Sequence, residues 1–242
     1  IQGLYAAASG MMGTEARQDV IANNIANAST PGFRRQEPVQ QGFHEIFVSE
    51  SRRAHFFDQS RGPGGGARLL STFTDLRSGI MTETDNPLNV ALSGPGFLAV
   101  DTPQGERYTR AGMMKVNDLG NLVTADGFTV QNAAGGAINV AEGNVQIARD
   151  GTVNVNGQFA GRLRLMEPAE PRGMVRMGDS LFMAAPDVPM AEAAETTVRQ
   201  NFLEQSNVRV PEEMLKLMLG SRTYEANARM AQAIDDTLGR LI

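Results

Sequence analysis

The side chains that most often carry catalysis are few in this sequence, and their spacing forms no catalytic pattern. The chain has two histidines, His44 and His55, and it lacks a Ser-His-Asp order, an HExxH motif and a pair of carboxylates that would share a cleft. Two acidic pairs, Glu212-Glu213 and Asp235-Asp236, are adjacent on predicted helices, where neighbouring residues do not face each other. We therefore expect no catalytic residue and no enzymatic activity.

Cofactor, metal and nucleic-acid sites are not indicated either. The chain has no cysteine, which excludes disulfides, thiol catalysis and Cys-based zinc sites. The glycine run at residues 62–66 lacks the Gly-Lys-Ser/Thr ending of a phosphate loop, and the Asp-Gly turns lack the calcium-binding spacing. The net charge is −5 and no basic run is longer than two residues, so no nucleic-acid-binding face is expected. We predict no cofactor, no metal and no nucleic-acid partner.

The N-terminal segment predicts a helix up to Ala28 with a narrow apolar seam. Residues recur every seven positions in two rows, which suits packing against a partner helix. Gly10 and Gly13 each lower the helix propensity by about 1 kcal/mol relative to Ala, so this helix should need a partner. Pro31 and Gly32 end it before Phe33. The rows are Leu4, Met11, Gln18 and Ile25, and Ala7, Thr14, Ile21 and Ala28.

Three asparagines, Asn23, Asn24 and Asn27, crowd the last turns of this helix. An amide donates and accepts hydrogen bonds, so at a helix contact it specifies a neighbour more than it adds stability. The alternative is that each is an exposed residue at a helix end, as most asparagines are. Their grouping beside an apolar seam favours an interface.

The middle of the chain has the pattern of an antiparallel β domain. Residues 31–71 read as an extended connector that contains the glycine run. From residue 72 short alternating strands are separated by tight-turn pairs such as Asp126-Gly127, Asp150-Gly151 and Asn156-Gly157. Residues 167–189 are rich in proline and read as an irregular return.

The last residues return to a helical pattern. Pro211 suits the first turn of a helix, and Glu212 and Glu213 favour the positive end of its dipole. An apolar row follows at seven-residue spacing, at Leu217, Tyr224, Ala231 and Leu238, flanked by Met214. The two terminal helices each need a partner, and we expect them to pair as a coiled-coil layer.

The predicted fold class is therefore α+β, with an antiparallel all-β domain inserted between two paired helices. The expected organisation is an N-terminal helix at residues 1–30, a connector at 31–71, a β-rich domain at 72–190 and a C-terminal segment with its helix at 191–242. Short heptad helices pack well only when neighbours cover their remaining faces, which favours a polymer subunit. No stretch approaches the length of a membrane span, and the N-terminus lacks the features of a cleavable signal peptide.

Several segments closely resemble the flagellar basal-body rod and hook protein family. Residues 3–11 (GLYAAASGM) and 19–35 (DVIANNIANASTPGFRR) match its N-terminal signature, and residues 203–241 match its C-terminal signature. Residues 86–100 and 108–130 resemble segments shared by the proximal and distal rod proteins, FlgF and FlgG. Pro211 departs from the family pattern and leaves the start of the C-terminal helix open.

The resemblance implies a subunit of a helical tube. Its terminal helices would surround an export channel, and the tube would transmit torque. It further implies export without a cleaved signal, residence in the periplasmic rod, and partners that include copies of the chain, other rod proteins, the hook and the export apparatus. The short chain and residues 86–92 favour the proximal rod protein. The alternatives are a distal rod or hook-like subunit, or a β module that binds the cell wall. The expected assembly interface comprises Leu4, Met11, Ile21, Asn23, Asn24, Ile25, Asn27, Phe33, Met214, Leu217, Tyr224, Ala231 and Leu238.

Overall fold

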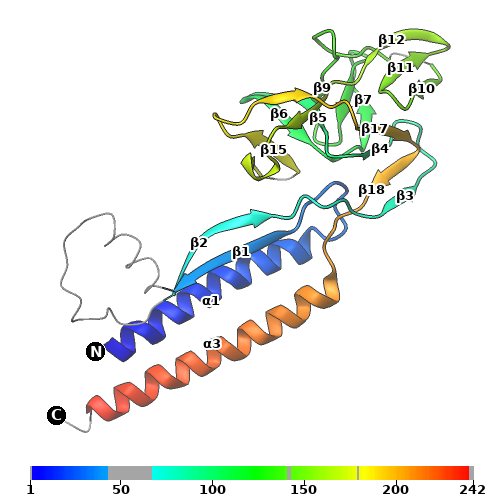
Figure 1. Cartoon of the computed structure of the whole chain (residues 1–242). Helices are drawn as coiled ribbons and strands as arrows, with labels where there is room; N and C mark the ends of the chain where they lie inside the picture. The colour runs from blue at the N-terminus through cyan, green and yellow to red at the C-terminus, as the bar shows by residue number, and fades with distance from the viewer. Residues whose placement is uncertain (1, 43–66, 141–142, 179, 240–242) are drawn as a thin grey trace. The chain divides into compact units, whose positions relative to one another are not determined.

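The computed structural model describes residues 2–42, 67–140, 143–178 and 180–239, which form two compact units. The helical unit comprises the described parts of Ile1–Ala26, Gln36–Asp75 and Val208–Ile242. The β-rich unit comprises those of Asn27–Arg35 and Leu76–Asn207 (Figure 1). The predicted α+β fold, with an all-β domain inserted between two paired terminal helices, is confirmed.

The helical unit contains two long helices, α1 (Gln2–Ala26) and α3 (Val210–Gly239), that pack against each other. Asn24 bonds to Glu213, Gln18 lies against Gly220, and Gly10 lies against Asn227 near the other end. Residue numbers that rise along α1 therefore meet numbers that fall along α3, so the helices are antiparallel. A Cβ at Gly10 would lie 3.0 Å from the Asn227 amide nitrogen, which explains why glycine suits this close approach.

A two-stranded ribbon lies along α1 in the same unit (Figure 1). Its strands are β1 (Gln36–Gly42) and β2 (Ala67–Thr74), which pair antiparallel with Gln36 opposite Thr74. Sequence reasoning treated this region as a connector and did not identify the pairing, because β1 reads QEPVQQG and lacks the alternating apolar residues of a typical strand. His44, His55 and the glycine run at 62–66 lie outside the described residues.

The β-rich unit is built of short antiparallel strands around an aliphatic core. Its largest sheet has the order β14-β15-β6-β5-β9-β8-β7, with β13 joining β5 to β16. A separate sheet has the order β10-β11-β12, and two further pairs are β17-β4 and β18-β3. The elements are β3 (Met81–Glu83), β4 (Val90–Ser93), β5 (Phe97–Thr102), β6 (Gly105–Thr109), β7 (Met114–Val116), β8 (Leu122–Thr124), β9 (Thr129–Val130), β10 (Val145–Ile147), β11 (Thr152–Val155), β12 (Gln158–Arg162), β13 (Leu165–Pro168), the 3-10 helix η1 (Pro171–Gly173), β14 (Met174–Arg176), β15 (Leu181–Ala184), β16 (Met190–Glu192), β17 (Thr197–Gln200) and β18 (Phe202–Glu204).

The tight turns predicted from Asp-Gly and Asn-Gly pairs are present. Asn156 and Gly157 have φ values of 52° and 80° and connect β11 to β12, as a two-residue hairpin requires. Gly127 and Gly151 also have positive φ. Turn residues therefore located the hairpins even where the strand pattern itself was weak.

The structure corrects two parts of the sequence-based description of this unit. Residues 167–189, expected to be irregular, contain η1, β14 and β15. The β-rich unit continues to Asn207 through β16, β17 and β18, beyond the residue 190 expected from sequence. Each of these strands has only three or four residues, which is too short for period-two alternation to be read with certainty.

Tyr108, on β6, gives the β-rich unit a pH-dependent stability. Burial, and then the hydrogen bond that its hydroxyl donates to Glu106 Oε1 over 2.6 Å, raise the pKa of Tyr108 from 10.0 to about 12. Because the unfolded chain loses this proton first, Tyr108 contributes a loss of unfolding free energy as the pH rises from 10 to 12. Arg110, whose pKa is lowered to about 10, contributes in the opposite direction over the same range, so denaturant unfolding is compared between the chain and Tyr108→Phe: the unfolding free energy of the variant relative to the chain should rise across this range. An unchanged pH profile in the variant would contradict the assignment.

Candidate assembly interface

One face of α1 forms the buried side of the helical unit. Ala7, Thr14 and Ile21 of the second predicted row are all buried, and the Thr14 hydroxyl donates to the carbonyl of Gly10 over 2.8 Å. A polar residue is tolerated in this seam because its hydroxyl is satisfied within its own helix. Residues of the other row, Met11, Gln18 and Ile25, are half-buried, while the side chain of Leu4 lies outside the described side chains.

The facing row on α3 is offset from the row predicted from sequence. Glu213 and Gly220 are buried, and Asn227 and Ile234 are half-buried; these four recur every seven residues. The predicted row lies four residues later, which turns it by about 40° along the same face. In that row Leu217 and Ala231 are half-buried, Tyr224 is 41% exposed, and Leu238 lies outside the described side chains.

Asn24 ties α1 to both of its neighbours in the helical unit. Its amide nitrogen donates to the carbonyl of Gln36 over 2.8 Å and to Glu213 Oε2 over 3.2 Å, and its Oδ1 accepts from the Gln36 N–H over 2.9 Å. Asn24 is fully buried, whereas Asn23 is exposed and Asn27 is half-buried. Of the three asparagines, Asn24 is therefore the one that specifies the packing of β1 and α3.

Replacing Asn24 with Ala should destabilise the helical unit by about 2–3 kcal/mol, because the buried Glu213 carboxylate and the half-buried Gln36 N–H and carbonyl would lose a partner. The loss of helix signal in far-ultraviolet circular dichroism reports this unit selectively, since α1 and α3 both belong to it. Asn23→Ala is the control, because Asn23 is exposed, and its effect should stay below about 1 kcal/mol. Equal losses of stability in the two variants would show that the hydrogen bonds of Asn24 make no specific contribution to the stability of the helical unit.

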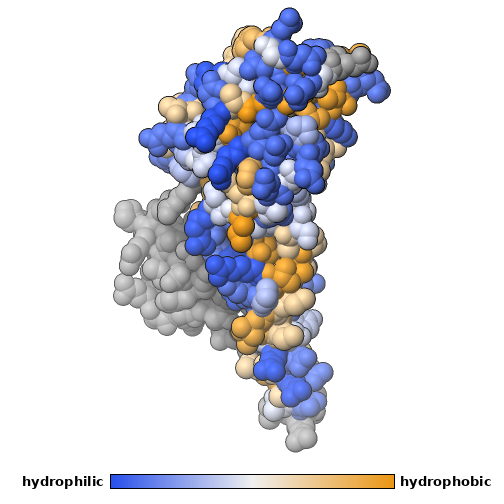
Figure 2. All heavy atoms as spheres, turned by 90° about the vertical axis from the view of Figure 1, so that its right-hand side faces the viewer, coloured by the Kyte–Doolittle hydropathy of each residue, from blue (hydrophilic) through white to orange (hydrophobic). Residues whose placement is uncertain are grey.

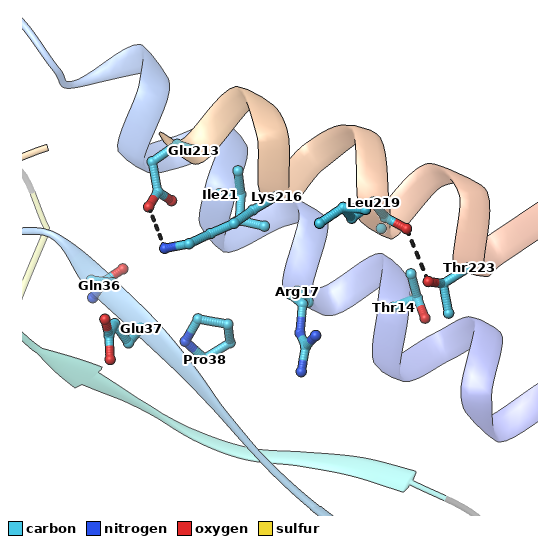
Figure 3. A pocket seen from close by; sticks show the side chains of 11 residues that line it. Thr14, Arg17, Ile21, Gln36, Glu37, Pro38, Glu213, Lys216, Leu219 and Thr223 are labelled. Carbon is cyan, nitrogen blue, oxygen red and sulfur yellow. Dashed lines mark hydrogen bonds and ion pairs between the residues drawn. The ribbon is translucent and has the colours of Figure 1, made fainter. Parts of the chain in front are cut away.

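A groove of about 340 Å³ runs between α1, α3 and β1 (Figure 3). Its walls carry both apolar groups and charges of both signs. Lys216 lies in it and donates to Glu213 Oε1 over 2.8 Å. The groove is lined by Thr14, Arg17, Ile21, Gln36, Glu37, Pro38, Glu213, Lys216, Leu219, Gly220 and Thr223.

The first half of α3 also exposes large apolar side chains. Met214, Leu215, Met218 and Leu219 are between 49% and 64% exposed. Figure 2, in which hydrophobic residues are orange, shows such side chains at the surface of the molecule. Exposed apolar groups in one cluster mark an interaction site more often than a solvated surface.

A buried charge cluster lies in the β-rich unit and was not identified from sequence. Glu204 Oε1 accepts from Arg34 Nη2 over 2.7 Å, and Glu204 Oε2 lies 3.6 Å from Arg110 Nη1. All three side chains are at most 3% exposed. Burial, and then the nearby charge of Arg34, lower the pKa of Arg110 to about 10, and Glu204 acts in the opposite direction.

The same cluster gathers the segments that lead into and out of the β-rich unit. The backbone N–H of Gly79 donates to Glu204 Oε1 over 2.9 Å, and that of Gly32 donates to the Glu204 carbonyl over 2.8 Å. Asn207 accepts from the N–H of Arg35 over 2.7 Å and donates to the carbonyl of Arg77 over 2.9 Å. These bonds join chain segments that are far apart in the sequence.

Phe33, expected at the assembly interface, is fully buried inside the β-rich unit, with the Arg176 guanidinium 4.2 Å from its ring centre. Arg34 follows it into the interior. A charged residue directly after a Gly-Phe pair was the one local sign of this arrangement. Nothing local connects Arg34 to Glu204, which lies 170 residues later.

Comparisons with known proteins agree with this architecture. Three family profiles match: "Flagella basal body rod protein" at residues 4–34, "Flagellar hook protein FlgE/F/G D1 domain" at residues 91–155, and "Flagellar basal body rod FlgEFG protein C-terminal" at residues 199–242. The first contains most of α1 and the last contains all of α3, and the middle one lies within the β-rich unit.

Curated relatives match along almost the whole chain. The flagellar basal-body rod protein FlgG of Caulobacter vibrioides is 32% identical, with 98% of this chain and 97% of that protein covered. The rod protein FlgF of Rhizobium meliloti is 30% identical over 99% of this chain and 96% of its own length. The chain belongs to the flagellar basal-body rod protein family, of the FlgF/FlgG type, as the sequence resemblance indicated.

Two further observations concern metal binding and membrane-crossing helices. Among the described residues, no three His, Asp or Glu side chains are grouped so that they could hold a metal ion. Neither described helix is both long and apolar enough to cross a membrane. The candidate site is the surface of the helical unit, where the groove and the exposed apolar side chains lie.

Proposed function

We propose that this chain is a structural subunit of the flagellar basal-body rod that polymerises into a helical tube through its helical unit. The observation that carries the proposal is the exposed apolar cluster on α3, inside the segment that matches the FlgEFG C-terminal family. Such a cluster is stabilised only when another surface covers it. The relatives are named as rod proteins, and in a rod the neighbouring subunits would cover this cluster.

The proposal extends to the setting of the rod. The tube transmits torque and encloses the export channel, and the chain reaches it through the flagellar export apparatus without a cleaved signal peptide. Its partners are copies of itself and the adjoining rod proteins, and it carries out no enzymatic reaction. The relatives include both FlgF and FlgG proteins, so their names support the proximal and the distal position alike. Nothing in the comparisons favours the wall-binding alternative.

Sedimentation velocity of the purified chain at increasing concentration tests this function. We expect a concentration-dependent shift from monomer to long polymers, visible as tubes or filaments by electron microscopy. The reason is that growth covers apolar area on every added copy. A chain that remains monomeric at all accessible concentrations, alone and with adjoining rod proteins, would contradict the proposal.

A further inference from the structure

The β-rich unit holds together three of the places at which the chain passes into the helical unit. The chain passes between the two units after Ala26, Arg35, Asp75 and Asn207. Asn207 Oδ1 accepts a hydrogen bond from the Arg35 N–H over 2.7 Å, and the Asn207 amide nitrogen donates to the carbonyl of Arg77 over 2.9 Å. Arg77 lies two residues beyond Asp75, so one side chain joins the last three of these passages at a single junction.

Other bonds of the β-rich unit support this junction. β18 pairs with β3, the Gln205 N–H donates to the carbonyl of Ile80 over 2.8 Å, and the Gly79 N–H donates to Glu204 Oε1 over 2.9 Å. The Gly32 N–H donates to the Glu204 carbonyl over 2.8 Å. Every residue in these bonds belongs to the β-rich unit, so the junction forms when that unit folds and needs no contact between α1 and α3.

Two elements of the helical unit begin close to this junction along the chain. β1 directly follows Arg35, and Glu213, in the first turn of α3, lies six residues after Asn207. In the helical unit, Asn24 of α1 bonds both to Gln36, the first residue of β1, and to Glu213. Asn24 and Glu213 are 189 residues apart along the chain. Once the β-rich unit is closed, a tether of six residues leads from the junction to Glu213 in place of this long loop.

We propose that the β-rich unit is a folding scaffold for the helical unit: by fixing Asn207 beside Arg35, it brings the start of α3 to the start of β1. The free energy of closing a flexible loop grows as (3/2)RT ln n with its number of residues n, so a tether of six residues in place of 189 favours the packing of α3 on α1 by a factor on the order of 100. α3 can therefore leave while the β-rich unit stays closed, whereas opening of the β-rich unit also weakens the packing of α3. This inference concerns the single chain and is independent of how its copies assemble.

Flexible Gly-Ser insertions into the full chain test this scaffold, at a concentration where sedimentation shows a monomer. Hydrogen exchange of the α3 amides is the measurement, because a helix that is not packed opens readily and loses most of its protection. An insertion between Asn207 and Val208 lengthens the tether and keeps the junction. We expect it to lower the equilibrium constant for packing of α3 about fourfold with about 10 inserted residues and about 20-fold with about 40.

The same insertions between Gly135 and Gly136 are the matched control. Both glycines are exposed in a turn of the β-rich unit, and a Cβ at either would meet nothing within 4 Å. These insertions add the same number of residues between Asn24 and Glu213, but they do not lengthen the tether. The equilibrium constant for packing of α3 should stay within about 1.5-fold of that of the unmodified chain. Protection of β4 and β5 should be unchanged in all variants.

Equal effects of the insertions at the two places would overturn the proposal, because the loop of 189 residues would then be the one that closes when α3 packs. A loss after Asn207 that does not grow with the length of the insertion would also overturn it, since such a loss reports only local damage at the start of α3. Stronger protection of α3 than of β4 and β5 in the unmodified chain would show that the helices stay packed while the β-rich unit opens, which contradicts the scaffold.

Discussion

Replacing Glu204 with Gln should destabilise the β-rich unit by about 3–5 kcal/mol, because it removes the carboxylate that lies between two buried guanidinium groups. Gln has nearly the same shape and volume as Glu, so the loss of unfolding free energy reports the removed charge and not a change in packing. Arg34 and Arg110 are held in the interior of this unit and cannot recover full hydration without opening it. Hydrogen exchange of the amides of β4 and β5, followed with denaturant, measures the effect.

The control for this prediction is Glu192→Gln, which breaks the ion pair with Arg162 in the same unit. That pair is 3.4 Å long, but its side chains are 67% and 47% exposed. Exposed pairs contribute at most about 1 kcal/mol, so amide protection should be nearly unchanged. If both variants lose the same stability, burial does not make the Glu204 ion pairs more important to stability than an exposed pair.

Replacing Met218 with Asp should leave the monomer folded and suppress polymer growth by at least about 100-fold in subunit affinity, which corresponds to roughly 3 kcal/mol. Met218 is 64% exposed, so the free chain can hydrate the new carboxylate. In the polymer that carboxylate would have to lose its hydration where another surface covers the apolar cluster of α3, which is costly. Sedimentation measures growth, and circular dichroism verifies that the helices persist.

Met177→Asp is the matched control for this second prediction. The residue type, the substitution and the degree of exposure are similar, but Met177 lies in the β-rich unit. Polymer growth should persist in this variant. The assignment of the interface to α3 would be wrong if Met177→Asp abolished growth and Met218→Asp did not.

Local patterns in the sequence predicted the two helices and most of the hairpins. Seven-residue spacing identified the helices, and Pro211 with the two glutamates after it predicted the first turn of α3, whose start was left open and lies at Val210. Asn-Gly and Asp-Gly pairs located turns because few other residues adopt positive φ. These features depend on neighbours within a few residues, and so they can be read directly from the chain.

Features that depend on distant residues were not predicted. The β1–β2 ribbon is stabilised by packing along α1, and its own sequence is polar and contains Pro38. The Glu204 cluster joins residues 170 positions apart in the sequence. Ion pairs have no sequence periodicity, so neither burial nor partner could be inferred.

The residues predicted for the candidate interface fall into two groups. Ile21 and Asn24 were selected from spacing and residue type, and they lie inside the helical unit, where they order its packing. Met214 was selected because it lies beside the predicted apolar row, and it belongs to the exposed apolar cluster on α3. The predicted set therefore combines residues that build the unit with residues that remain available to a second copy.

The bonds that Glu204 and Asn207 make to Gly32, Arg35 and Gly79 have a consequence for dissecting the molecule. A fragment that starts at Leu76 and ends at Asn207 is continuous, yet it lacks Phe33 and Arg34, which fill its interior and neutralise Glu204. Such a fragment lacks part of its own core and should not fold stably by itself. It requires residues 27–35 as a separate peptide or a fused extension, so the β-rich unit can close only after residues 27–35 have come together with residues 76–207.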